Sequence, residues 1–147
     1  MLIRGGSLEK IGMFGEINSG EEKIVLAPQV FLTQQDIREF QLAKAAIAAG
    51  LQILLNQLDV TFKDIETVFI AGGFGNFLNI ENVIRTGLIE CEKEKIVKFG
   101  NTALIGAKMF LFEDEECIQK ILEKTTHVNL ESDPNFQDIY IEKLMLI

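Results

Sequence analysis

The sequence is poor in the residues that build metal centres and redox sites. Its two cysteines are Cys91 and Cys117, and its one histidine is His127. Neither cysteine belongs to a Cys-x-x-Cys pair, so we expect no zinc site and no iron–sulfur cluster, and both thiols should act as small apolar side chains. His127 has no second histidine beside it, and we expect it at the edge of a strand rather than in a catalytic or metal-binding role.

Long apolar runs and clustered positive charge are also missing. No stretch reaches the ~18 apolar residues of a membrane span, and the opening MLIRGGSLEK lacks the apolar centre of a signal peptide. The net charge is −8 with no basic stripe, which argues against nucleic acid or an anionic membrane surface as a partner. We therefore expect a protein of the cytoplasm.

The composition that remains is typical of one globular domain. Hydrophobic residues make up 48% of the chain and charged residues 24%, as in folded α/β or α+β proteins. No linker is visible, so residues 1–147 predict a single domain. Within it we expect an N-terminal hairpin region at residues 1–30 and an α/β core at residues 31–147.

Turn and capping residues divide the chain into strands that alternate with helices, which predicts an α/β fold with parallel strands. Pro28 should end the hairpin, Asn79 and Asn101 should cap helices, and Gly87 should end one. The expected elements are hairpin strands at 11–17 and 23–27, a helix at 34–58, a strand at 68–71, a helix at 80–86, a strand at 95–99, helices from 102 and at 114–124, a strand at 128–130 and a closing helix from 132.

The expected helix at 34–58 has two distinct kinds of side chain. Thr33 and Asp36 form a capping-box pattern at its start. Gln41 and Lys44 are expected on a solvated face, with contact to a ligand or to a portion of the protein outside this chain as the alternative. The alanine-rich middle at 43–50 fits either close packing of another backbone or helix propensity alone. The large apolar residues recur at three- and four-residue intervals and are therefore expected on one face of the helix: Ile37, Phe40, Ile47, Leu51, Leu54, Leu55 and Leu58.

The segment VFIAGGFGN, residues 68–76, places glycines directly after an apolar strand that we expect to be buried on both faces. Because glycine has no Cβ, a ligand at the carboxyl end of such a strand can contact the main chain. A tight turn explains the same glycines, and the pattern matches neither the dinucleotide fingerprint nor a Walker A loop. Phe74 and Phe77 are placed either to stack on a base or to pack on the sheet.

Two further groups have a structural and a functional interpretation. Asn101 follows a glycine and precedes a helix, so we expect an N-cap, with ligand contact as the second option. The acidic run EDEE at residues 113–116 suggests a metal site at first sight. The favourable interaction of carboxylates with the start of a helix explains the run better.

Four stretches between about residues 10 and 147 together resemble a known family: LTQQDIREFQLAKAAIAAG, VFIAGGFGN, GNTALIGAK and DPNFQDIYIEKL. In this order they resemble the C-terminal domain of the reductive activators of corrinoid proteins. Those activators are related to the ASKHA superfamily of sugar kinases, actin and heat-shock chaperones, which bind ATP between two similar halves. The resemblance implies a ribonuclease-H-like, actin-like ATPase half-domain, with strands packed against helices and incomplete relative to the two-lobed fold.

The same resemblance implies a nucleotide-binding loop made of Gly72, Gly73, Phe74, Gly75 and Asn76, on the adenosine side of the site. It also implies that the helix at 34–58 packs across the interface between the two halves. The superfamily holds phosphate and magnesium with Asp-x-Gly hairpins, and the sequence contains none. A ferredoxin-like cysteine-rich segment is likewise missing, so we expect the chain to be the C-terminal portion of a longer activator or the product of a split gene.

The function implied by the resemblance is that of the nucleotide-side subdomain of an ATP-dependent reductive activator of corrinoid proteins in methyl-transfer metabolism. The full-length family uses ATP or ADP with Mg²⁺, and the implied partners are a corrinoid protein and the N-terminal portion of the activator, with a homodimer as a further candidate. We assign this chain no catalytic and no metal-binding residue, and expect it alone to bind ATP weakly or not at all. The alternative is a non-enzymatic interaction or oligomerisation module.

Overall fold

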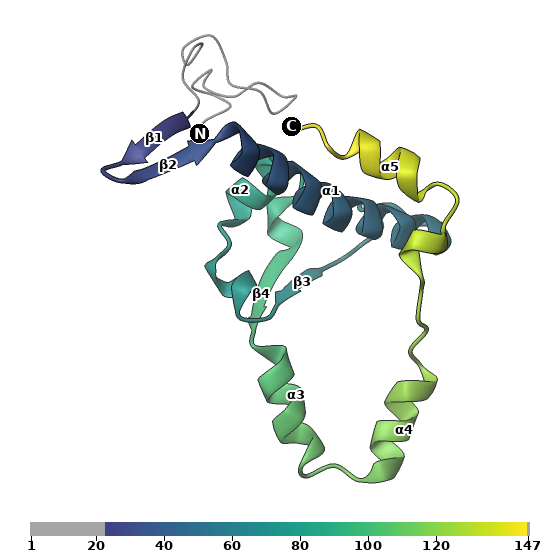
Figure 1. Ribbon diagram of the computed structural model, residues 1–147. Coiled ribbons are helices and arrows are strands. Elements are labelled where there is room, and N and C mark those ends of the chain that lie inside the picture. The colour runs from purple at the N-terminus through teal and green to yellow at the C-terminus, as the bar shows by residue number, and fades with distance from the viewer. Residues whose placement is uncertain (1–22, 147) are drawn as a thin grey trace.

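The computed structural model describes residues 23–146. In Figure 1, α1 crosses the upper part of the molecule with α5 beside it, and the β3–β4 sheet lies below α1. The elements are β1 (Lys23–Ala27), β2 (Val30–Thr33), α1 (Gln34–Gln57), β3 (Val68–Ala71), α2 (Ile80–Arg85), β4 (Ile96–Gly100), α3 (Thr102–Phe110), α4 (Glu115–Glu123), α5 (Phe136–Glu142) and the short 3₁₀ turns η2 (Phe74–Phe77), η3 (Lys93–Lys95) and η4 (Leu130–Ser132).

The N-terminal hairpin differs from the expected one in its second strand. β1 has the predicted bounds, but it pairs antiparallel with β2, which was not predicted. Pro28 and Gln29 form the turn between them, and Gln29 has a positive φ of 67°. Pro28 therefore sets a hairpin turn instead of ending the hairpin. The expected strand at residues 11–17 lies outside the described residues.

The sheet at the centre is parallel, as predicted, but it is less buried than predicted. β3 and β4 run parallel to each other, with α2 between them in the chain. The Phe69 side chain is 59% exposed and that of Phe99 is 54% exposed, so β3 is not buried on both faces. The two rings meet edge to face, with centroids 5.3 Å apart. In the described part of the chain this sheet has two strands, and the face that carries Phe69 and Phe99 is open to solvent.

Side-chain caps begin the helices that follow the sheet, where the sequence predicted them. The Asn79 Oδ1 atom accepts a hydrogen bond from the Asn82 amide at 3.1 Å, and Asn101 caps α3 in the same way. The Asp114 Oδ1 atom accepts from the Cys117 amide at 2.8 Å, which confirms that the acidic run begins a helix. Gly87, with φ 71°, follows α2.

The segment that leads from α4 to α5 is not a strand. Residues 125–129 belong to no described strand, and η4 begins at Leu130. The expected strand at 128–130 is therefore wrong, because three residues beside no neighbouring strand have nothing to pair with. His127 is exposed within this segment and not at the edge of a strand.

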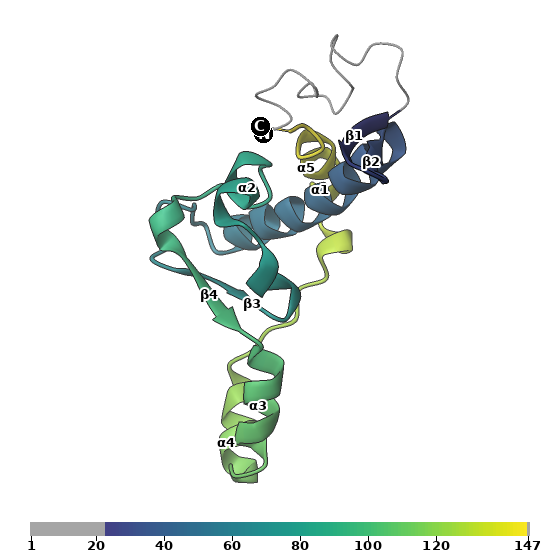
Figure 2. The same ribbon diagram turned by 90° about the vertical axis from the view of Figure 1, so that its left-hand side faces the viewer.

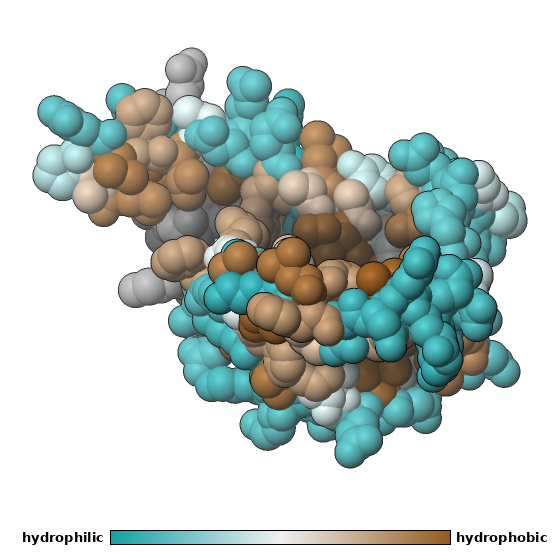
Figure 3. Space-filling model, turned by 90° about the horizontal axis from the view of Figure 1, so that it is seen from below, coloured by the Kyte–Doolittle hydropathy of each residue, from teal (hydrophilic) through white to brown (hydrophobic). Residues whose placement is uncertain are grey.

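α3 and α4 project from the sheet, away from α1, and the chain turns back between them (Figures 1 and 2). No residue of either helix is buried. Figure 3 views this end of the molecule and shows apolar surface among the charged side chains. No helix of the described residues is long and apolar enough to span a membrane.

A complete capping box begins α1, as predicted. The Thr33 Oγ1 atom accepts a hydrogen bond from the Asp36 amide at 3.2 Å, and the Asp36 Oδ2 atom accepts one from the Thr33 amide at 2.7 Å. The hydrogen bonds from the Thr33 amide and hydroxyl hold the pKa of Asp36 below its ordinary value. The helix ends at Gln57, one residue before the predicted end.

The small residues of α1 are buried, whereas several of its large ones are not. Ile47 is 53% exposed and Leu58 is 70% exposed, so the face expected for the large apolar residues is not buried at these positions. A Cβ on Gly50 would lie 3.0 Å from the Leu130 Cδ1 atom. Close packing, and not helix propensity alone, therefore explains the alanine-rich middle, which neighbours within this chain cover. The buried small residues are Ala45, Ala48, Ala49 and Gly50.

Lys44 and Gln41 hold the end of α5 against α1. Lys44 is 2% exposed, and its Nζ atom donates to the carbonyl oxygens of Lys143 and Met145, each at 2.6 Å. The Gln41 Nε2 atom donates to the Leu144 carbonyl oxygen at 2.9 Å. Carbonyl groups at a helix end lack partners inside the helix, and these side chains supply them. The expectation of a solvated face is therefore wrong for both residues.

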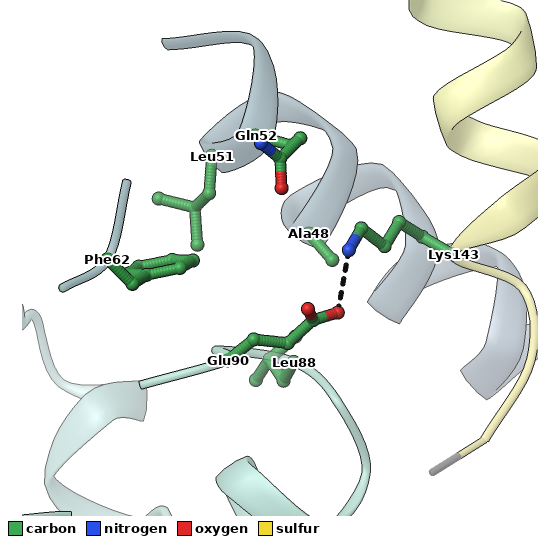
Figure 4. A pocket seen from close by; sticks show the side chains of 7 residues that line it. All are labelled: Ala48, Leu51, Gln52, Phe62, Leu88, Glu90 and Lys143. Carbon is green, nitrogen blue, oxygen red and sulfur yellow. Dashed lines mark hydrogen bonds and ion pairs between the residues drawn. The ribbon is translucent and has the colours of Figure 1, made fainter. Parts of the chain in front are cut away.

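An ion pair extends this anchor to the loop after α2. The Lys143 Nζ atom lies 2.7 Å from the Glu90 Oε1 atom, as Figure 4 shows across a narrow crevice beside α1. Burial lowers the pKa of Lys44 below its ordinary value of 10.5, while the Glu90 charge opposes this shift and the Lys143 charge adds to it. Three separate parts of the chain thus meet around one buried ammonium group.

Replacing Lys44 with methionine should weaken the fold. Lys44→Met keeps most of the side-chain volume but leaves the carbonyls of Lys143 and Met145 without their donor, and we expect the free energy of unfolding to fall by about 2–3 kcal/mol. Urea unfolding followed by circular dichroism measures this change. Lys124→Met, at an exposed position, is the control and should stay within about 0.5 kcal/mol of the parent. Equal losses in both variants would contradict the anchoring role.

The lowered pKa of Lys44 also predicts a pH dependence. The folded chain releases the Lys44 proton at a lower pH than the unfolded chain, so the unfolded chain binds more protons in the interval below about pH 10.5. The free energy of unfolding of the parent, relative to that of Lys44→Met, should therefore rise with pH across that interval. Urea titrations at several alkaline pH values check this, and a relative stability that falls with pH would contradict it.

Candidate functional site

The candidate site lies where the carboxyl ends of β3 and β4 meet. The Gly72 amide donates a hydrogen bond to the Gly100 carbonyl oxygen at 2.7 Å, which joins the two strand ends. Residues 72–76 follow β3, and Asn101 with the start of α3 follows β4. In open α/β sheets, ligands bind beside the carboxyl ends of the strands. The fold therefore brings the predicted loop to an edge that suits ligand binding.

Gly72 and Gly73 leave their main chain uncovered. No atom of the described structure lies within 4 Å of a Cβ built on either residue. Gly72 has φ +92°, a conformation that other residues rarely adopt, whereas Gly73 has an ordinary helical conformation with φ −59°. Gly72 is thus required by the turn itself, and Gly73 leaves open space that nothing in the turn explains.

Gly75 has a different reason for being glycine. A Cβ at this position would lie 2.7 Å from the Ile70 Cγ2 atom, so η2 packs directly against β3. The tight-turn interpretation of the glycines therefore holds at Gly75, and close approach by a ligand is left as an option at Gly72 and Gly73. The sequence pattern alone did not separate these two uses.

The two phenylalanine rings near the loop are exposed to solvent, and a lysine of β4 holds the main chain of the loop in place. Phe74 is 79% exposed and Phe77 is 89% exposed, so packing of these rings on the sheet is wrong. Stacking on a bound ring is the use that remains from the two expected ones. The main-chain oxygen of Asn76 accepts a hydrogen bond from the Lys98 Nζ atom at 3.0 Å, which ties the loop to β4.

The last residue of β4 and the residue that follows it also belong to this edge. Gly100 has φ +75° and open space around its missing Cβ. The Asn101 Oδ1 atom accepts a hydrogen bond from the Leu104 amide at 3.2 Å, which confirms the N-cap interpretation. Sequence reasoning missed Gly100, although two predicted strands that are each followed directly by glycine could have indicated it. Its position beside Gly72 adds a third glycine with open space to this edge.

The acidic, histidine and thiol side chains elsewhere in the described chain are the other candidates for chemistry. No group of three or more His, Cys, Asp or Glu side chains is gathered closely enough among the described residues to hold a metal ion. Burial raises the pKa of the Cys91 thiol, and a hydrogen bond with Glu113 raises that of Cys117. Both thiols therefore stay protonated at neutral pH and are poor nucleophiles.

Parallel strands with helices after their carboxyl ends place this domain in the class of open α/β folds. Within that class, residues 10–147 match the family described as the "C-terminal domain of RACo the ASKHA domain". The chain belongs to this family. This finding confirms the predicted resemblance and the predicted actin-like α/β fold.

Related proteins agree with this assignment. The chain is 35% identical to the corrinoid activation enzyme RamQ of Eubacterium limosum over 97% of its own length. It is 28% identical to the Co(II) methylated amine-specific corrinoid protein reductase of Methanosarcina barkeri over 98%. A solved reductive activator for corrinoid, iron–sulfur protein superimposes on 99% of the chain with a TM-score of 0.84 and 30% identity. The chain spans 26% of the length of each of these three proteins.

Alanine substitutions should separate the two kinds of glycine in the loop. Gly72→Ala forces a Cβ into a positive-φ conformation, and we expect it to lower the free energy of unfolding by about 1–3 kcal/mol. Gly73→Ala, in open space, is the matched control and should change it by less than about 0.5 kcal/mol. Urea unfolding of both variants provides the comparison. A Gly73→Ala loss as large as that of Gly72→Ala would mean that the space at Gly73 is filled.

Proposed function

We propose that this chain is the nucleotide-side domain of an ATP-dependent reductive activator of corrinoid proteins, acting in the cytoplasm. The observation that carries the proposal is the uncovered main chain of Gly72 and Gly73 at the carboxyl edge of two parallel strands. Membership in the ASKHA family and the named activities of the relatives support it. We treat residues 1–147 as one domain of a longer working unit.

The loop residues divide the recognition of adenosine between them. The purine lies against Gly72 and Gly73, where a side chain would hold it away from the main chain. The exposed Phe74 ring supplies a face for stacking, and Gly75 lets η2 pack on β3 so that the loop keeps its shape. Asn76 is held by Lys98 through its main chain. Binding, and not bond breaking, is the contribution of these residues.

Phosphate chemistry and electron delivery belong to other parts of the full-length protein in this proposal. ATP or ADP with Mg²⁺ is its nucleotide, and the sequence offers no Asp-x-Gly hairpin for the phosphates. The partners are a corrinoid protein and the N-terminal portion of the activator. A nucleotide that binds more tightly to one arrangement of the two portions shifts the protein toward that arrangement, which couples ATP to engagement of the corrinoid partner.

A second candidate function is favoured by the projecting helices. α3 and α4 have no buried residue, as expected of an interaction or oligomerisation module that works without nucleotide. A homodimer is the simplest product of such a module. Calorimetric titration of the chain with ATP and Mg²⁺, alongside size-exclusion chromatography, separates the candidates, because a module of this kind self-associates to the same extent with and without ATP.

The decisive test places the loop in a full-length activator. In a chimaera, this chain replaces the corresponding C-terminal quarter of RamQ, and ATP affinity is measured by calorimetry. Gly73→Leu puts a large side chain where the purine is proposed to lie, and we expect ATP affinity to fall by at least about 10-fold, or about 1.4 kcal/mol. Gly73→Ala adds one methyl group and should lower the affinity less.

Fold stability provides the control for this test. Both Gly73 variants should unfold at the same urea concentration as the parent, because no described atom lies within 4 Å of the added Cβ. Equal ATP affinities in the parent chimaera and in Gly73→Leu would contradict the adenosine assignment. The isolated chain should bind ATP weakly or not at all, since the proposed phosphate site lies in the other portion.

A further inference from the structure

α3 is apolar over most of its surface. Its sequence TALIGAKMF contains two polar residues, Thr102 and Lys108, and the Leu104 and Met109 side chains are 55% and 56% exposed. A nine-residue helix in water gains little stability from its backbone alone. A helix that is apolar all round is normally buried in a larger protein. α3 therefore has the sequence of a buried helix, and the described part of the chain leaves it exposed.

The apolar surface continues beyond α3. Leu111 and Phe112, between the two helices, are 79% and 89% exposed. We call the exposed apolar side chains of α3 and α4 the projecting surface, and part of it is visible in Figure 3. The acidic residues 113–116 border it at the far end of the projection. The projecting surface comprises Leu104, Ile105, Met109, Phe110, Ile121 and Leu122.

Gly106 shows what kind of group can cover α3. No described atom lies within 4 Å of a Cβ built on this residue, and its φ is not in the positive range. Ala103 lies three residues before Gly106 and therefore shares its side of the helix. These small residues let another backbone approach α3 closely. The expected cover is a helix or strand of a folded protein and not a small ligand.

The solved activator indicates where that cover comes from. It superimposes on 99% of this chain with a TM-score of 0.84, so the matched arrangement takes in nearly the whole chain. That protein is about four times as long as the matched part, since the match covers 26% of it. The shared arrangement therefore occurs in a protein where most of the polypeptide lies outside this domain.

We propose that, in a full-length activator, polypeptide outside this domain packs against the projecting surface. A helix or strand backbone lies over Gly106, apolar side chains cover Met109 and Phe110, and lysine or arginine side chains lie opposite the carboxylates at 113–116. The inference rests on the proposed function in one respect, that the chain works within a full-length activator. It does not depend on nucleotide binding by the loop at 72–76.

Hydrogen–deuterium exchange tests the proposal directly. The α3 amides of the isolated chain should exchange rapidly, because no residue of this helix is buried. In the RamQ chimaera we expect them to exchange at least about 100-fold more slowly, as in a buried helix. α1 provides the internal reference, since it is partly buried within this chain and should be protected in both proteins. Intact RamQ is measured in parallel, at the segment aligned with α3, in case the chimaera folds poorly.

A matched pair of leucine substitutions locates the covered side. Gly106→Leu fills the side that is proposed to meet the other backbone. Lys108→Leu places the same side chain about 200° around the helix. Both variants of the isolated chain should keep the parent circular dichroism. In the chimaera, Gly106→Leu should lose at least about 10-fold of the α3 protection, while Lys108→Leu should keep it.

Each result decides between the proposals. Rapid exchange of α3 in the chimaera and in intact RamQ would overturn the inference. Protection of α3 in the isolated chain together with a dimer in size-exclusion chromatography would also overturn it, in favour of a second copy as the cover. Protection of α3 in a chimaera that binds no ATP would support the inference and contradict the nucleotide function. Tight ATP binding by a chimaera whose α3 is unprotected would support the nucleotide function and contradict the inference.

Discussion

The fold depends on one buried cation. The ammonium group of Lys44 is removed from water, and it is compensated by main-chain carbonyls at the end of α5. Without these carbonyls its burial would be costly, and without Lys44 the helix end would lack donors. Because Lys143 also pairs with Glu90, the same contact fastens the loop that leads from α2 toward β4. The long helix, the last helix and the sheet are held in one arrangement by this small group of atoms.

Local chemistry made much of this fold predictable from the sequence. The capping box at Thr33, the caps at Asn79 and Asn101, and the parallel pair of strands follow from side chains a few residues apart. The buried face of α1 did not follow, because its large residues suggested one side and its alanines another. Lys44 was assigned to solvent since lysine usually keeps its charge in water, and its carbonyl partners lie 99 and 101 residues away.

The candidate site also combines features that the sequence predicted with features that only the structure shows. Three glycines in VFIAGGFGN look equivalent in the sequence, yet Gly72 is demanded by its φ, Gly75 by the nearby Ile70 side chain, and Gly73 by neither. Gly100 joins them through strand register, which spacing along the chain does not reveal. The nucleotide assignment of these residues came from resemblance to a family. The geometry adds that main chain is open at the edge where such folds bind ligands.

The burial of Lys44 has a chemical consequence outside folding. Acetylating and other amine-modifying reagents require an unprotonated and accessible amine, and here the nitrogen is enclosed between α1 and the end of α5. Lysines on the outside, such as Lys124, are open to the same reagents. The rate at which Lys44 is modified therefore reports how often the end of α5 separates from α1. Mass spectrometry can measure this rate without any label on the protein.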